Sequence, residues 1–71
     1  MTGKSIRLNG ELRSLSGRAT VSSLLEAEGV NLAAKGTAVA VNAELIPRSE
    51  WDERELGDGD VVDVIRAVQG G

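Results

Sequence analysis

The chain contains no cysteine and no histidine. It has 71 residues, lacks Tyr and Phe, and has Trp51 as its one aromatic residue. Without Cys no disulfide or thiolate metal site can form, and without His the commonest general base and metal ligand is missing. A domain of this length also buries a thin core, which leaves little room for an enclosed active site. These absences argue against an enzyme that uses its own side chains.

The sequence also lacks a long apolar run. No stretch approaches the roughly 18 apolar residues of a membrane span, and residues 1–5 are not followed by the apolar segment of a signal peptide. We therefore expect a cytoplasmic protein that contacts no membrane. The net charge is +3 over residues 1–25 and −6 over residues 26–71. The bases have no aromatic neighbours, so we expect no nucleic-acid partner; the acidic half is either a solvated face or a surface for a basic protein.

An N-terminal hairpin is predicted from two alternating segments. Residues 5–9 form a half-buried strand, and residues 11–15 form a weaker one after an Asn-Gly pair. A two-residue turn would place Leu8 opposite a glutamate, whereas a three-residue loop would place Leu8 opposite Leu12. We favour the longer loop or a bulge, because that register keeps one face of the hairpin apolar.

One helix follows the hairpin. Thr20 is suited to cap it with its hydroxyl group, and apolar residues recur at i, i+3 and i+4 within residues 21–28. Gly29 stands where a left-handed residue ends a helix. A helix this short is not stable alone, so it must pack on a sheet.

Three further strands are predicted, at residues 37–42, 45–46 and 61–66, with Pro47 ending the second of them and a Gly-Asp-Gly-Asp turn preceding the third. The order of elements predicts an α+β fold, with a mixed sheet of four to five strands covered by one main helix. The last strand is the most apolar, so we expect it in the centre beside the first. Residues 1–66 would form this domain, and residues 67–71 a flexible C-terminal arm.

The arm ends in Gly70-Gly71. Two glycines leave no side chain beside a terminal carboxylate, so the backbone can enter a channel too narrow for any Cβ atom. The alternative is a frayed end without a function.

Several stretches together form a familiar pattern. They are Val39-Ala40-Val41-Asn42, Ile46-Pro47-Arg48-Ser49-Glu50-Trp51, Leu56, Asp58-Gly59-Asp60 with Val62, Ala67-Val68-Gln69-Gly70-Gly71, and, in the N-terminal half, Asn9-Gly10-Glu11 and Thr20-Val21 with Leu24-Leu25. This pattern resembles the ThiS family, the sulfur carrier proteins of thiamine biosynthesis.

The resemblance implies a ubiquitin-like β-grasp fold and a reaction. An adenylating enzyme related to ubiquitin-activating enzymes would use ATP and Mg²⁺ to convert the carboxylate of Gly71 into an acyl-adenylate. A persulfide of a sulfur donor protein would then replace AMP, and the resulting thiocarboxylate would give its sulfur to the thiazole ring on thiazole synthase. Gly71 would bear the sulfur, while Gly70 and the residues Gln69, Val68 and Ala67 would give access to partner active sites. The chain itself would bind no cofactor.

Four residues are candidates for partner contact. Ile65 faces away from the buried side of its strand and, with Ala38 and Ala40, would form a modest apolar patch on the open sheet face; the alternative is a scattered surface residue. Trp51 is either an interface anchor or a cover for the edge of the core. Arg48 pairs either with an acidic partner or with a neighbouring glutamate.

Other interpretations stay open at this point. The turn over residues 57–60 with Asp63 could suggest a Ca²⁺ loop, but it lacks the remaining spaced acids, so a plain turn and no metal site is favoured. A carrier for molybdopterin or cysteine synthesis, a ubiquitin-like modifier and a purely structural interaction domain are alternative functions. We expect the chain alone to be a monomer.

Overall fold

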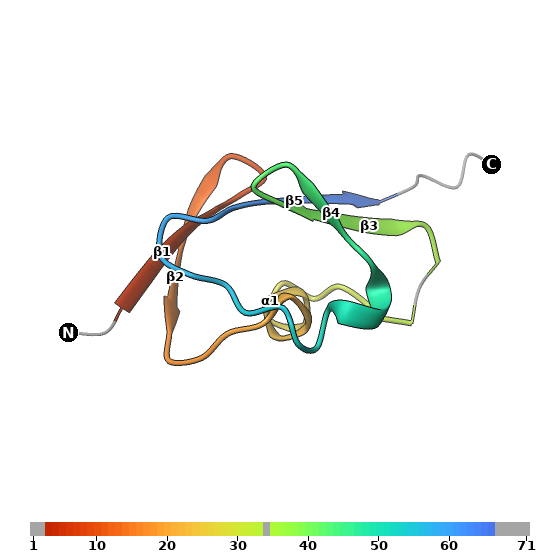
Figure 1. Cartoon of the computed structure of the whole chain (residues 1–71), viewed down its shortest axis with the longest axis horizontal. Helices are drawn as coiled ribbons and strands as arrows, with labels where there is room; N and C mark the ends of the chain where they lie inside the picture. Colours follow the sequence, from red (N-terminus) through yellow and green to blue (C-terminus); the bar gives the residue numbers. More distant parts are fainter. Residues whose placement is uncertain (1–2, 34, 67–71) are drawn as a thin grey trace.

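The computed structural model describes residues 3–33 and 35–66 (Figure 1). They form five strands, one α-helix and one short 3-10 helix. In chain order these are β1 (Gly3–Leu8), β2 (Glu11–Ser16), α1 (Val21–Ala27), β3 (Thr37–Val41), β4 (Glu44–Ile46), η1 (Arg48–Glu50) and β5 (Val61–Arg66).

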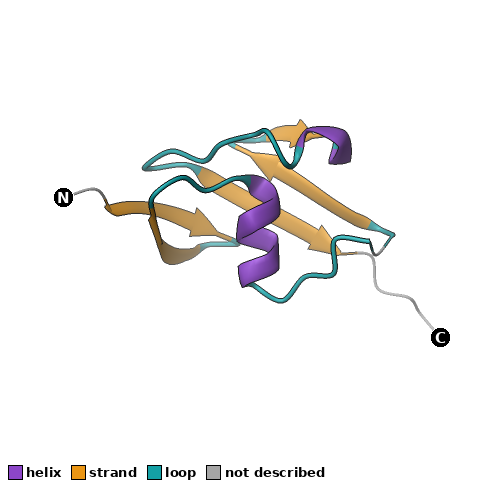
Figure 2. Ribbon diagram, turned by 90° about the horizontal axis from the view of Figure 1, so that it is seen from below, coloured by secondary structure: helices purple, strands orange, loops and turns teal. Residues whose placement is uncertain are grey.

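The five strands form one mixed sheet in the order β2-β1-β5-β3-β4. β1 and β5 are parallel, and the other neighbouring pairs are antiparallel. Figure 2 shows that α1 crosses one face of the sheet and leaves the other uncovered. The predicted α+β fold with one main helix is therefore confirmed, and so is the central position of the last strand beside the first.

The register of the N-terminal hairpin is a correction to the sequence prediction. A two-residue turn joins β1 to β2, with φ of 51° at Asn9 and 84° at Gly10, and Leu8 is paired with Glu11. The three-residue loop that would pair Leu8 with Leu12 is wrong. An Asn-Gly pair accepts two successive left-handed residues, which suits the twist of a tight hairpin. This turn preference outweighs the burial of Leu12, which lies on the edge strand with 62 % of its surface exposed.

The helix agrees with its prediction to within one residue. The Thr20 hydroxyl accepts a hydrogen bond of 3.2 Å from the Ser23 backbone N–H, and the Ser23 hydroxyl accepts one of 2.8 Å from the Thr20 N–H. This reciprocal pair satisfies two backbone donors at the helix start. The helix ends at Ala27, and Gly29 follows with a left-handed φ of 79°.

The core lies between α1 and the sheet. Its buried members are Ile6, Leu8, Val21, Leu24, Leu25, Val30, Val39, Val41, Ile46, Trp51, Leu56 and Val62. Alternation along β3 and β5 directs Val39, Val41 and Val62 into this core, each fully buried. Burial of one such side chain stabilises the fold by about 1.5–3 kcal/mol. β5, the strand that leads to the C-terminal arm, is therefore fixed in the middle of the molecule.

Candidate functional site

The five residues to which the sequence assigns the chemistry are Ala67, Val68, Gln69, Gly70 and Gly71, and they lie outside the described residues. The structure describes the strand that leads to them. β5 ends at Arg66, where the predicted domain ends. The described part of the candidate site consists of β5 and its neighbours.

β3 holds β5 along most of its length. Val62 is paired with Val41, Val64 with Val39, and Arg66 with Thr37, so antiparallel pairing reaches the last residue of β5. On its other side, β5 is paired with β1 only at Val61 and Val62. The base of the arm is thus supported mainly from one side.

Three of the four candidate contact residues lie together on the uncovered face of the sheet. Ile65 on β5 is paired with Ala38 on β3, and Ala40 is paired with Asp63, so these side chains point to the same face. Ile65 has 58 % of its surface exposed, whereas both alanines are half-buried. Predicted from alternation alone, this grouping agrees with the structure, although its contact with a partner stays a prediction.

Further exposed apolar residues lie on the same face, interspersed with the charged side chains of Arg7 and Asp63. The large exposed hydrophobic residues are Leu12, Leu45, Val61 and Ile65. Leu12 is paired with Arg7, which is itself paired with Val61, and Leu45 is paired with Ala40. All of them therefore belong to the uncovered face, which we call the open face, defined by Leu12, Ala38, Ala40, Leu45, Val61 and Ile65. The sequence alone could not group these positions, because only the strand order and the register of the sheet show that they share one face.

Trp51 belongs to the core. Its exposed fraction is 3 %, and its indole Nε1 donates a hydrogen bond of 3.0 Å to the backbone carbonyl of Ile46. The Arg48 guanidinium lies over the ring, 4.6 Å from its centre, and donates to the Leu32 carbonyl. This burial corrects the assignment of Trp51 as an exposed interface anchor and agrees with the alternative that it covers the core. Arg48 serves the same packing.

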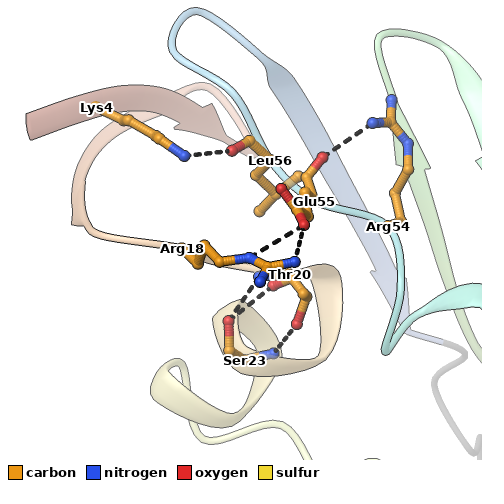
Figure 3. A network of polar contacts seen from close by, with 7 residues as sticks. All are labelled: Lys4, Arg18, Thr20, Ser23, Arg54, Glu55 and Leu56. Atoms are coloured by element: carbon orange, nitrogen blue, oxygen red, sulfur yellow. Dashed lines mark hydrogen bonds and ion pairs between the residues drawn. The ribbon is translucent and has the colours of Figure 1, made fainter. Parts of the chain in front are cut away.

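A network of polar contacts joins the start of α1 to residues 54–56 (Figure 3). Arg18 forms an ion pair with Glu55, and the Lys4 ammonium donates a hydrogen bond of 3.2 Å to the Leu56 carbonyl. Hydrogen bonding to Arg18, and then its positive charge, lower the pKa of the Glu55 carboxyl group. The network fastens the helix to the chain that leads into β5, and we assign it a structural role.

The turn before β5 uses its carboxylates internally. Asp58 Oδ1 accepts a hydrogen bond of 2.7 Å from the Ser5 N–H, and Asp60 Oδ2 accepts one of 2.8 Å from the Gly57 N–H. Burial acts to raise the pKa of Asp60, but the hydrogen bonds from Gly57 and Asn42 outweigh it and lower this pKa. Within residues 3–33 and 35–66 no three His, Cys, Asp or Glu side chains are grouped to hold a metal ion.

A cavity of about 180 Å³ lies beside the end of β5. Its apolar lining comes from Leu8, Leu25, Val30 and Val64, and its polar lining from Asn9, Glu11, Arg13, Glu28 and Arg66. Arg13 reaches Glu11 at 3.0 Å and Glu28 at 3.2 Å. Hydrogen bonding to Glu28, and then to Glu11, raises the pKa of Arg13. The polar lining of the cavity thus includes an ion-paired group of Glu11, Arg13 and Glu28.

None of the helices in the described part of the chain is long and apolar enough to span a bilayer.

Comparison with known proteins gives the family. The sequence model of the ThiS family matches residues 6–71. The chain is 48 % identical over 64 residues to the sulfur carrier protein ThiS of Thermus thermophilus, covering 90 % of this chain and 95 % of that protein. It is also 34 % identical over 64 residues to a thiazole synthase of Paramagnetospirillum magneticum, covering 90 % of this chain but 19 % of that protein.

Comparison with solved structures identifies the same family. The crystal structure of the thiamine biosynthesis protein ThiS from Geobacter metallireducens superposes with a TM-score of 0.76 at 29 % identity, covering 94 % of this chain and 99 % of that one. The ubiquitin-like β-grasp fold expected from the resemblance is thereby confirmed. The chain belongs to the ThiS family, the sulfur carrier proteins of thiamine biosynthesis.

Proposed function

We propose that this chain carries sulfur as a thiocarboxylate on Gly71 and delivers it for formation of the thiazole ring. In the first step the Gly71 carboxylate attacks ATP bound with Mg²⁺ on an adenylating enzyme, which gives an acyl-adenylate and releases pyrophosphate. A persulfide on a donor protein then attacks the acyl carbon and expels AMP. A thiol then attacks the donor protein's sulfur in the resulting acyl disulfide, which breaks the S–S bond, forms a new disulfide with the donor and releases the thiocarboxylate.

The observation that carries the proposal is the family match through the Gly-Gly pair. The match extends to residue 71, and it includes the stretch Ala-Val-Gln-Gly-Gly that follows β5. Glycine at both final positions lets a carboxylate approach a reaction centre without a side chain in the way. A central strand, anchored in the core by Val62 and paired with β3 as far as Arg66, leads to this stretch and supports an arm that must enter another protein.

The proposed division of labour follows from the side chains present. The sequence has no Cys or His, and it has no phosphate-binding Gly-rich loop followed by Lys. We therefore assign activation of the carboxylate to the adenylating enzyme, and this chain is a substrate and carrier, not a catalyst. The absence of an internal thiol also prevents self-attack on the activated acyl group. The cytoplasm remains the predicted location.

Thiazole synthase is the proposed acceptor of the carrier. A segment similar to 90 % of this chain forms 19 % of the thiazole synthase of Paramagnetospirillum magneticum. A carrier and an enzyme that share one polypeptide act in the same reaction sequence, and this supports a partnership between separate chains as well. The open face supplies the contact surface in this proposal, because it exposes Leu45, Val61 and Ile65 and α1 covers only the opposite side.

The test uses cells that lack their own carrier. The wild-type chain and a variant without Gly71 are expressed, and thiazole synthesis is followed with a labelled sulfur source. We expect the wild type to restore labelled thiazole and the shortened chain to fail. Equal synthesis with both chains would contradict the proposal. Conjugates of the chain with other proteins, in place of labelled thiazole, would identify a modifier instead.

A further inference from the structure

The C-terminal half of β5 has a strand on only one side. β3 is paired with β5 as far as Arg66, whereas β1 turns away after Leu8, the partner of Val62. Beyond this point the side of β5 next to β1 borders the cavity lined by Val64 and Arg66. The last residues before the arm therefore lack a neighbouring β-strand on that side within the described part of the chain.

One side chain continues the support where β1 ends. The Asn9 N–H donates a hydrogen bond of 2.9 Å to the Val62 carbonyl, and Asn9 Oδ1 accepts one of 2.8 Å from the Val64 N–H. In the second bond, Asn9 Oδ1 accepts the hydrogen bond that a backbone carbonyl of β1 would accept if that strand were longer. Asn9 thus holds β5 two residues before Arg66, and it does so through its side chain.

The turn conformation explains why an asparagine can do this. Asn9 has a left-handed φ of 51°, which directs the chain into β2 while its short amide side chain stays beside β5. Asparagine tolerates this conformation better than other residues with a side chain, and its oxygen accepts hydrogen bonds from nearby backbone. A glycine in place of Asn9 would keep the turn conformation but would lack the side-chain hydrogen-bond acceptor. An aspartate would keep both the turn conformation and the acceptor.

We propose that Asn9 is a positioning residue for the sulfur-carrier reaction. By fixing Val64, it sets the course of β5 up to Arg66, the residue from which the chain continues to the proposed reaction site at Gly71. This inference rests on the proposed function. A misplacement of about 1 Å can lower a reaction rate by as much as roughly 100-fold, so we expect loss of this hydrogen bond to slow transfer.

The second hairpin provides a matched control. Asn42 also has a left-handed φ, of 53°, in the turn between β3 and β4. Its N–H donates a hydrogen bond of 2.7 Å to the Val61 carbonyl, and its Oδ1 accepts one of 2.9 Å from the Val61 N–H. Asn42 therefore holds the start of the same strand, while Asn9 holds the part that leads to the arm.

The experiment compares Asn9→Gly, Asn9→Asp and Asn42→Gly with the wild type. Each full-length chain is given to the adenylating enzyme with ATP and Mg²⁺, and kcat and KM for AMP transfer are measured under conditions where all four are folded. Amide hydrogen exchange at Val64 is measured in parallel. We expect kcat/KM to fall about tenfold in Asn9→Gly, with faster exchange at Val64. Asn42→Gly should keep kcat/KM within about twofold, and Asn9→Asp should restore both readouts.

Three results would overturn the inference. Unchanged kcat/KM in Asn9→Gly would show that the hydrogen bond does not position the arm. Equal losses of kcat/KM in Asn9→Gly and Asn42→Gly would show that both asparagines only stabilise β5 in general. A wild-type chain that acquires no AMP would overturn both the proposed function and this inference. This outcome can be distinguished from the first one, in which the wild type acquires AMP but reacts no faster than Asn9→Gly.

Discussion

The guanidinium of Arg48 lies 4.6 Å from the centre of the Trp51 ring. On its buried side the same indole donates to the Ile46 carbonyl, so Trp51 joins η1, β4 and the core. The lone tryptophan is thus a structural residue, with a cation over one face of its ring and a backbone acceptor at its edge.

Replacing Trp51 with phenylalanine should lower stability without slowing the reaction. The change removes the indole donor and leaves a smaller ring in a buried place, which costs about 1–3 kcal/mol of unfolding free energy. Urea unfolding followed by circular dichroism measures this loss. Leu45→Ala, at an exposed residue of β4, is the control and should change stability by less than about 0.5 kcal/mol. A slower AMP transfer with unchanged stability would identify Trp51 as a partner contact after all.

Replacing Ala43 with glycine should stabilise the protein. Ala43 has a φ of 70°, a left-handed conformation in which its Cβ atom is strained. Removing that strain gains roughly 1–2 kcal/mol, and the greater freedom of glycine in the unfolded chain offsets about half of it. Thermal unfolding should therefore show a higher Tm. The same change at Ala40, which lies in extended β3, should lower Tm, and a fall with both variants would contradict the conformational argument.

Stability should fall in acid partly through Asp60. Its pKa is lowered in the folded protein from the ordinary value of 3.8, because the hydrogen bonds from Gly57 and Asn42 outweigh the opposing effect of burial. A lowered folded-state pKa gives stability that is present above 3.8 and is lost as pH falls through the folded value. Urea unfolding between about pH 5 and about pH 2 measures this loss. Asp60→Asn should be less stable than the wild type at neutral pH but should lose less unfolding free energy in acid. Parallel curves of unfolding free energy against pH for the two chains would contradict the role assigned to Asp60.

A charge placed on the open face should weaken partner binding more than stability. Ile65→Asp puts a second carboxylate beside Asp63 on the face that we assign to the interface, whereas in the free chain the site is 58 % exposed. We expect unfolding free energy to change by about 1 kcal/mol, and the KM of thiazole synthase for the thiocarboxylate form of the chain to rise about tenfold. Asn31→Asp adds the same charge to the exposed loop after α1 and should leave KM unchanged. Equal KM values for all three chains would exclude the open face as the contact surface.

Local patterns in the sequence were sufficient for much of the fold. Alternation in residues 37–42 and 61–66 predicted that Ala38, Ala40 and Ile65 share one face of the sheet, and the cap at Thr20 predicted the helix start. These signals are local because side-chain direction in a strand or a helix turn depends on spacing alone. The β-grasp fold came from the family resemblance, which covers almost the whole chain.

Features that depend on strand order or on competing preferences could not be predicted in this way. The hairpin register was wrong because the turn preference of Asn9-Gly10 outweighed the burial of Leu12. Leu45 and Val61 joined the open face only once the strand order was known. The hydrogen bond from the Val64 N–H to Asn9 Oδ1 joins residues 55 positions apart, so no local pattern in the sequence indicates it.

The central claim is that Gly71 becomes a thiocarboxylate. The most direct test incubates the purified chain with its adenylating enzyme, ATP, Mg²⁺ and a persulfide donor, and records the intact mass followed by fragmentation. The account predicts a mass change equal to replacement of one oxygen by sulfur, located at Gly71 and absent without ATP. An unchanged mass, or sulfur attached at any other residue, would contradict it.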